Sequence, residues 1–91
     1  MTTINIRPLH NIAKDIVNDI NAQYADQGKP NPDWVMYAMP YIVALNELNS
    51  IEDDYYADNA YSVVCYTLSN LSYWRGATAK AVKAELKAMI A

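Results

Sequence analysis

Apolar residues recur every three or four positions along most of this chain, and this spacing constrains the fold more than any other feature. Between residues 9 and 24 they form one continuous stripe, with polar residues on the opposite side. The stripe consists of Leu9, Ile12, Ile16, Ile20 and Tyr24. Because residues three or four apart share one face of an α-helix, the pattern predicts an amphipathic helix. Pro8 suits its first turn, and Gly28 suits its end.

The second predicted helix begins at Asn31, a good N-cap residue, with Pro32 at the first helical position. Apolar residues nearly surround this segment, as expected of a central helix that packs on several sides. Pro40 removes one backbone hydrogen bond and crowds the preceding turn, which predicts a kink or a break near this residue. The apolar stripe continues through Ile51 to Tyr55, so the helix is expected to run into the acidic stretch that follows.

Two more helices complete the predicted fold. Asp58 is the expected N-cap of a helix over residues 59–74, and Gly76 is expected to end it. The inner face of this third helix is predicted to hold Tyr61, Val64, Leu68 and Leu71. Thr78 can cap a last helix that turns its lysines outward. The expected fold class is therefore all-α, a compact four-helix bundle (three to five helices) that forms a single domain over residues 1–91.

A strand interpretation competes only weakly with the helical one. Two segments are rich in β-branched and aromatic residues, "YIVAL" at residues 41–45 and "YSVVCYTL" at residues 61–68. Neither segment alternates cleanly between apolar and polar residues, and neither is bounded by hairpin turn residues. The helical prediction is therefore kept for both.

The composition is that of one small globular domain in a reducing compartment. The chain has 91 residues, of which 53% are hydrophobic and 19% are charged. No charged leader with an apolar run opens it, and no apolar run reaches the length of a membrane span, so neither secretion nor membrane insertion is expected. The single cysteine, Cys65, cannot form an internal disulfide, which suits the cytoplasm.

No combination of residues in the sequence indicates catalysis or metal binding. His10 is the only histidine and has no evident orienting partner, so it is expected to be a surface residue. Cys65 has no cation near it in sequence and is expected to fill a small apolar space. The acidic stretch lacks the glycine and the final glutamate of an EF-hand loop, and no Glu-x-x-His pair occurs. The sequence therefore predicts no enzyme activity, no metal and no cofactor.

Charge is spread unevenly around a net value of -3. Residues 32–61 carry six acidic side chains and no basic one, whereas residues 62–91 carry four basic side chains and one acidic one. Lys80, Lys83 and Lys87 share one face of the last predicted helix and are expected to face the solvent. Three lysines fall short of the roughly 6 to 10 phosphate contacts that give useful non-specific affinity, so direct DNA or RNA binding is not expected.

The aromatic residues point instead to protein binding. The chain has eight tyrosines and two tryptophans but no phenylalanine, so almost every aromatic ring has a polar tip suited either to a contact surface or to the rim of a core. The densest group lies in "IEDDYYADNAY", residues 51–61, where some of the acids also suit the start of a helix. We predict that this segment docks a basic protein surface. Its predicted partner-binding residues are Glu52, Asp53, Asp54, Tyr55, Tyr56, Asp58 and Tyr61.

The C-terminal segment "LSNLSYWRGATAKAVKAELKAMI" resembles the tail of small accessory proteins encoded by phages and prophages. In those proteins a helix ending in Ser-Asn-x-x-x-Trp-Arg-Gly is followed by a helix with Ala-x-x-x-Lys-x-Glu-Leu. The matching residues are Ser69, Asn70, Trp74, Arg75, Gly76, Ala79, Lys83, Glu85 and Leu86. The motif itself suits a structural role, in which Trp74 closes the core, Gly76 adopts a left-handed cap and Arg75 bonds helix-end carbonyls or an acid.

The resemblance covers a minority of the chain and implies a context rather than an active site. In that context, small acidic helical proteins inhibit host proteins by occupying their surfaces, as anti-CRISPR and antirestriction inhibitors do. The expected function is therefore that of a non-enzymatic inhibitor in the host cytoplasm. Its expected partner is a basic, nucleic-acid-handling host protein such as a CRISPR effector or a restriction enzyme. The alternative is a structural or regulatory homo-oligomer, such as a homodimer, whose aromatic residues meet their own copies.

Overall fold

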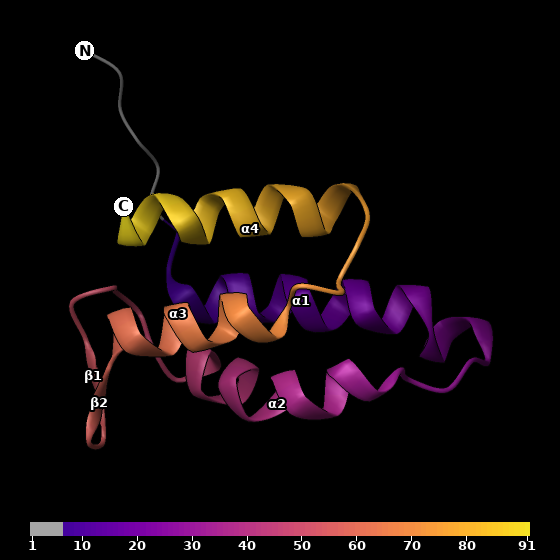
Figure 1. Ribbon diagram of the computed structural model, residues 1–91, viewed down its shortest axis with the longest axis horizontal. Helices are drawn as coiled ribbons and strands as arrows, with labels where there is room; N and C mark the ends of the chain where they lie inside the picture. The colour runs from indigo at the N-terminus through magenta and orange to yellow at the C-terminus, as the bar shows by residue number, and fades with distance from the viewer. Residues whose placement is uncertain (1–6) are drawn as a thin grey trace, which may run out of the picture.

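The computed structural model describes residues 7–91, so residues 1–6 of the predicted single domain lie outside the described residues. Four helices, α1 (Leu9–Gln23), α2 (Asp33–Asn46), α3 (Ala60–Asn70) and α4 (Ala77–Ile90), alternate in direction and form a bundle (Figure 1). Each helix packs on its two neighbours in the order α1, α2, α3, α4. A 3-10 turn, η1 (Ala25–Gln27), follows α1, and a hairpin of β1 (Asp54–Tyr55) and β2 (Asp58–Asn59) joins α2 to α3. The helical prediction is confirmed, and this hairpin is an addition to the expected all-α fold.

One apolar core runs through the bundle. Its largest members are Leu9, Ile12, Ile16, Ile20, Ile42, Leu45, Val64, Leu71, Trp74 and Leu86. Burying one such aliphatic side chain contributes about 1.5–3 kcal/mol to folding. The stripe predicted for α1 is the buried face of that helix, with Tyr24 packed at its edge. Within residues 7–91, the helices are all too short or too polar to cross a lipid bilayer.

The start of α1 is tied to the chain segment that follows α2. The backbone N–H groups of Leu9 and His10 donate to the carbonyls of Asn49 and Leu48, each at 2.9 Å. These bonds satisfy donors that the first turn of a helix leaves without an internal partner. His10 is half-buried, and its Nδ1 lies 3.3 Å from the Leu48 carbonyl. The expectation that His10 is a simple surface residue is therefore wrong.

Arg7 joins the beginning of α1 to α4. Its Nε and Nη2 donate to the two carboxylate oxygens of Glu85 at 3.0 and 2.7 Å, and its Nη1 pairs with Asp15. The hydrogen bonds to Glu85, and then those to Asp15, raise the pKa of the guanidinium above its ordinary value. Arg7 carries one positive charge, so it offsets only part of the negative charge of these two acids.

The second helix differs from its prediction in three ways. It begins at Asp33, with Pro32 rather than Asn31 in the N-cap position. It is continuous through Pro40, so the break, one of the two predicted outcomes, is absent. The proline lies on an exposed side of the helix, where water can bond the carbonyl that its ring leaves free. It ends at Asn46, so the predicted extension to Tyr55 is wrong.

The third helix begins where the hairpin ends. Asn59 is its N-cap, and the side-chain carbonyl accepts from the Ser62 N–H at 2.8 Å, so the prediction of Asp58 as the cap is wrong. Residues Ala60, Val63, Val64 and Thr67 form its buried face. Tyr61, which was predicted to face inward, is half exposed because the helix is rotated relative to the predicted stripe.

The connection between α3 and α4 is fixed by Trp74. As the sequence predicts, this side chain closes the core, and only 1% of it is exposed. Its Nε1 donates to Asp19 of α1 at 2.7 Å, and its carbonyl accepts from Lys83 of α4 at 2.6 Å. Gly76 directly precedes α4, and its φ of 116° and ψ of 176° lie outside the left-handed helical region, so the prediction that it ends α3 as a left-handed cap is wrong. α4 also begins before the predicted cap Thr78.

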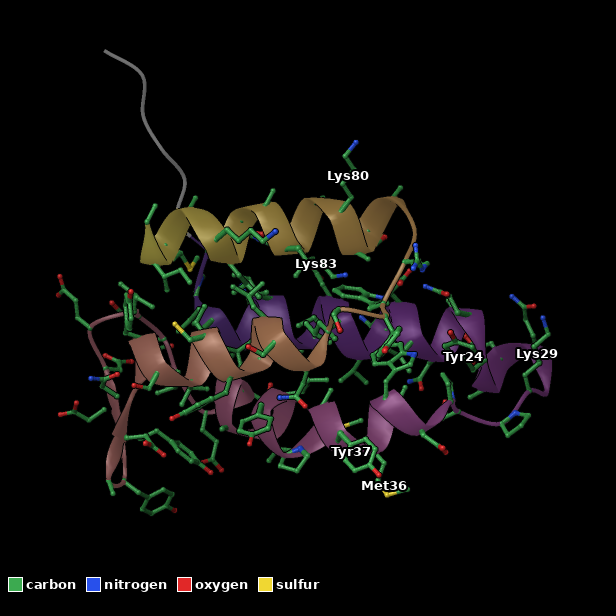
Figure 2. All side chains as sticks on the ribbon, viewed as in Figure 1. Tyr24, Lys29, Met36, Tyr37, Lys80 and Lys83 are labelled. Carbon is green, nitrogen blue, oxygen red and sulfur yellow. The ribbon has the colours of Figure 1, made fainter. Side chains whose placement is uncertain are left out.

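The three lysines of α4 do not form a uniform solvent-facing surface. Figure 2 shows Lys80 pointing away from the bundle and Lys83 turned towards the loop before α4. Lys83 is half-buried, and burial, followed by the charges of Lys87 and Arg75, lowers its pKa. The predicted outward position is therefore right for Lys80 and Lys87 and wrong for Lys83.

Candidate functional site

The acidic stretch folds into a hairpin that projects from one end of the bundle (Figure 1). Asp54 pairs with Asn59, and Tyr55 pairs with Asp58. Because neighbouring positions of a strand point to opposite faces, Asp54 and Asp58 lie on opposite faces of this narrow ribbon. The structure therefore presents carboxylates on both sides of a projecting element rather than on one flat face.

Tyr56 occupies the turn of the hairpin and is 87% exposed. Its φ of 53° lies in the left-handed region, which costs a residue with a Cβ about 1–2 kcal/mol. Two-residue hairpin turns ordinarily use glycine or asparagine at such positions. The ring contacts Tyr55 edge-on, with centroids 4.8 Å apart. A large aromatic side chain that is both exposed and held in an unfavourable backbone conformation is a mark of a functional site.

Tyr55 anchors the hairpin to the bundle. Its side chain is half-buried and packs against the core cluster. Burial raises the pKa of its phenol, and the nearby Glu47 carboxylate and Tyr56 raise it further. Glu47 follows the end of α2 and is exposed, so it adds a carboxylate that the predicted site omitted. Its place in the acidic part of the sequence was the only signal for including it.

Asp53 holds the base of the hairpin. One of its carboxylate oxygens accepts hydrogen bonds from the backbone N–H groups of Asn49 and Ser50 at 2.9 and 3.0 Å. Its own carbonyl accepts from the Ala60 N–H at 2.8 Å, which closes the two ends of the hairpin segment. The bonds from Ser50 and Asn49 lower the pKa of the Asp53 carboxyl. Asp53 thus positions the hairpin, and only part of its carboxylate is free to meet a partner.

We expect the base of the hairpin to loosen in acid. Because the pKa of Asp53 is lower in the folded chain, the carboxylate stabilises the fold above the unfolded-state pKa, and this contribution is lost as pH falls below about 4. The amide resonances of Asn49 and Ser50 should shift in that range, and the Ala60 amide should lose protection from hydrogen exchange. The variant Asp53→Asn should not show the pH-dependent shift. A midpoint at or above the ordinary aspartate pKa would contradict this role.

The remaining predicted residues divide into two groups. Glu52 is exposed, and its N–H donates to the Ser50 hydroxyl at 3.1 Å, so it lies beside the hairpin base. The Tyr61 hydroxyl donates to the Ile90 carbonyl at 3.4 Å, which places Tyr61 on the side of α4. Of the predicted residues, Asp54, Tyr56 and Asp58 are exposed on the hairpin, and Glu52 is exposed at its base. Tyr61 lies apart from them.

The hairpin combines uncompensated negative charge with an aromatic tip. Both ion pairs between described residues involve Arg7, so neither neutralises a hairpin carboxylate. Within residues 7–91, no three His, Cys, Asp or Glu side chains converge in a way that would hold a metal ion. Clustered charge of one sign attracts surfaces of opposite charge and accelerates their association. The chemistry of this site therefore suits contact with a cationic surface.

Similarity to other proteins gives no further guide to this site. Comparison of the chain with protein-family models, with curated protein sequences and with solved structures gave no match. The role of the hairpin is therefore inferred from its geometry and charge.

Proposed function

We propose that this protein is a non-enzymatic binding module that inserts its acidic hairpin into a basic cleft of a nucleic-acid-handling protein. The observation that supports this most strongly is Tyr56, an almost fully exposed ring held at positive φ on the tip of the hairpin. Tyrosine is one of the residues that most often dominate the energy of protein interfaces. At this position it adds nothing to the core of the bundle, so contact with a partner is the role that fits its exposure.

The shape of the hairpin favours a cleft over a flat surface. Asp54 and Asp58 lie on opposite faces of the ribbon, so a flat basic surface can pair with only one of them. A cleft with basic side chains on both walls can pair with both, which offsets the cost of removing the two carboxylates from water. Clefts that follow a nucleic-acid backbone have such walls, because they neutralise phosphates with lysine and arginine.

The titratable residues outside the hairpin fit a binding role. The ring of His10 contacts the Leu48 carbonyl, and Cys65 is a half-buried residue in the middle of α3. The resemblance of residues 68–90 to phage accessory proteins suggests inhibition as the result of binding, because a protein whose nucleic-acid cleft is blocked cannot bind its nucleic acid. The proposed class is an inhibitor of the anti-CRISPR or antirestriction type.

Charge reversal at the hairpin tests this proposal. Wild type, Asp54→Lys/Asp58→Lys and Asp26→Lys/Asp33→Lys are immobilised in parallel and exposed to a bacterial lysate. Both double variants change the net charge equally, and all four aspartates are exposed, but the second pair lies away from the hairpin. We expect a protein that wild type and the second variant retain and that the hairpin variant loses. Excess duplex DNA should release it, because the hairpin and DNA would compete for one cleft.

Substitution of the tip separates binding from folding. Tyr56→Gly should stabilise the fold by up to about 1 kcal/mol, because glycine adopts positive φ without strain. The same variant should weaken capture, since the aromatic anchor is lost. If no captured protein depends on Asp54, Asp58 and Tyr56, or if DNA leaves every captured protein bound, the proposal is wrong.

A further inference from the structure

A second surface is formed where α2 packs on α3, and it consists mainly of aromatic rings. Tyr41 of α2 and Tyr66 of α3 lie with their ring centroids 5.6 Å apart. Tyr37 of α2, Trp34 of α2 and Tyr73 of the loop between α3 and α4 line one shallow depression of about 150 Å³. We call these five residues the tyrosine face. They come from segments about 30 residues apart in sequence, so folding alone brings them together.

The tyrosine face carries no charge. Residues 34–46 and 59–74, which supply all of α2 after its first residue and all of α3, contain no Asp, Glu, Lys, Arg or His. The polar side chains beside it are turned back on their own helix: the Ser69 hydroxyl donates to the Cys65 carbonyl, and the Asn70 amide donates to the Tyr66 carbonyl. Exposed helix surfaces in water normally carry charged residues, so their absence here needs a cause.

The exposed rings are large enough to form the centre of an interface. Tyr37 is 66% exposed, Tyr66 50% and Tyr73 69%. At about 150–250 Å² per aromatic side chain, these three rings alone offer roughly 300–450 Å². Met36, which projects beside Tyr37 in Figure 2, and the exposed Pro40 extend this area. The three rings alone are roughly half of the 800 Å² per partner that a stable protein interface buries, and the surface has the aromatic-rich, charge-poor composition of an interface centre.

We propose that the tyrosine face pairs with the same face of a second copy of this chain around a two-fold axis. In such a pair each side contributes the same surface, so the surface must complement itself. The hairpin end and the exposed lysines of α4 would each bring like charges together. Pairing through the tyrosine face brings no like charges together. Each tyrosine hydroxyl is both a donor and an acceptor, so the hydroxyls of two copies can also hydrogen-bond to one another.

An acidic partner fits this surface less well than a second copy does. A glutamate pressed against these rings would be removed from water without an opposite charge to pair with, which is unfavourable. Self-association also suits a domain of this size, whose single core buries a limited share of the chain surface. This proposal does not depend on the proposed function of the hairpin, because the two surfaces share no residue.

Sedimentation across the micromolar range tests the proposal. Wild type is compared with Tyr37→Glu/Tyr73→Glu, which places two like charges per chain at the centre of the proposed pair. The control is Tyr56→Glu, which places one negative charge on the hairpin. We expect wild type and Tyr56→Glu to reach the mass of a dimer as concentration rises. The double variant should remain monomeric, because loss of each hot-spot ring should increase the dissociation constant of the dimer at least tenfold.

The fold of each variant is checked by circular dichroism, and the two face tyrosines are exposed enough that their replacement should preserve it. A wild-type protein that stays monomeric throughout this range would overturn the proposal. So would a folded double variant that dimerises as strongly as wild type. Loss of the dimer in Tyr56→Glu would instead assign self-association to the hairpin and would equally overturn it.

Discussion

Replacing Trp74 by alanine is expected to reduce the free energy of unfolding by about 3–5 kcal/mol, the range found for large buried aromatic residues. This indole is almost completely buried and closes the core at the turn between α3 and α4. It also bonds Asp19 of α1 through Nε1, and the Trp74 carbonyl holds Lys83 of α4. Alanine would leave a cavity and would leave an Asp19 oxygen with one hydrogen-bond donor fewer. Because small domains have about 5–15 kcal/mol in total, much of the stability would be lost.

Two control variants separate the causes of this loss. Trp74→Phe keeps most of the apolar volume but removes the donor to Asp19, so about 1–3 kcal/mol should be lost. Trp34→Ala removes a tryptophan that is only half-buried at the edge of the core, so its cost should be smaller than that of Trp74→Ala. Urea unfolding followed by circular dichroism measures all three. A loss below about 1 kcal/mol for Trp74→Ala would show that the indole does not close the core.

Replacing Pro40 by alanine is expected to stabilise the protein by about 1–3 kcal/mol. A proline inside a helix costs up to about 3 kcal/mol relative to alanine, because it lacks the N–H and crowds the carbonyl one turn earlier. α2 nevertheless continues without a break through this residue. The Pro40 side chain lies on an exposed side, so removal of the ring sacrifices little packing in the core. Alanine restores the missing backbone hydrogen bond to Met36.

The matched control for this variant is Pro32→Ala. Pro32 occupies the N-cap position of α2, where the helix needs no N–H from it, so no comparable gain is expected. Both variants are compared by the same urea unfolding measurement. Equal effects of the two substitutions, or a loss of stability in Pro40→Ala, would show that the helix is already adapted to the proline at residue 40.

The apolar spacing of the sequence predicts the four helices and the buried face of α1, although it places Tyr61 of α3 on the wrong side. It fails at the acidic stretch, where Ile51 and Tyr55 extend the apolar period of α2 beyond its actual end. A side chain competes with the helix there: the Asp53 carboxylate takes the N–H groups of Asn49 and Ser50. The hairpin turn also lacks the Asn-Gly or Asp-Gly pair from which a hairpin is usually predicted. A bond between side chain and backbone that depends on the folded loop leaves no periodic signal.

Only the amino-acid composition of the accessible site could be predicted from the sequence. The cluster of acids and tyrosines is visible in the sequence, and the structure places Asp54, Tyr56 and Asp58 on the hairpin and Glu52 at its base. The division between contact residues and supporting residues was not predictable, because it depends on the hydrogen bonds of Asp53 and the packing of Tyr55. The tyrosine face was not predictable either, since its rings are brought together only when α2 packs on α3.

Titration of the ¹⁵N-labelled protein with an arginine-rich peptide tests most directly whether the hairpin is the surface that meets cationic partners. The largest amide shift changes should lie between Glu52 and Asn59, and they should shrink as salt is added. They should disappear in Asp54→Lys/Asp58→Lys and persist in Asp26→Lys/Asp33→Lys. Changes that are largest in α1, or spread evenly over all acidic residues, would contradict the account.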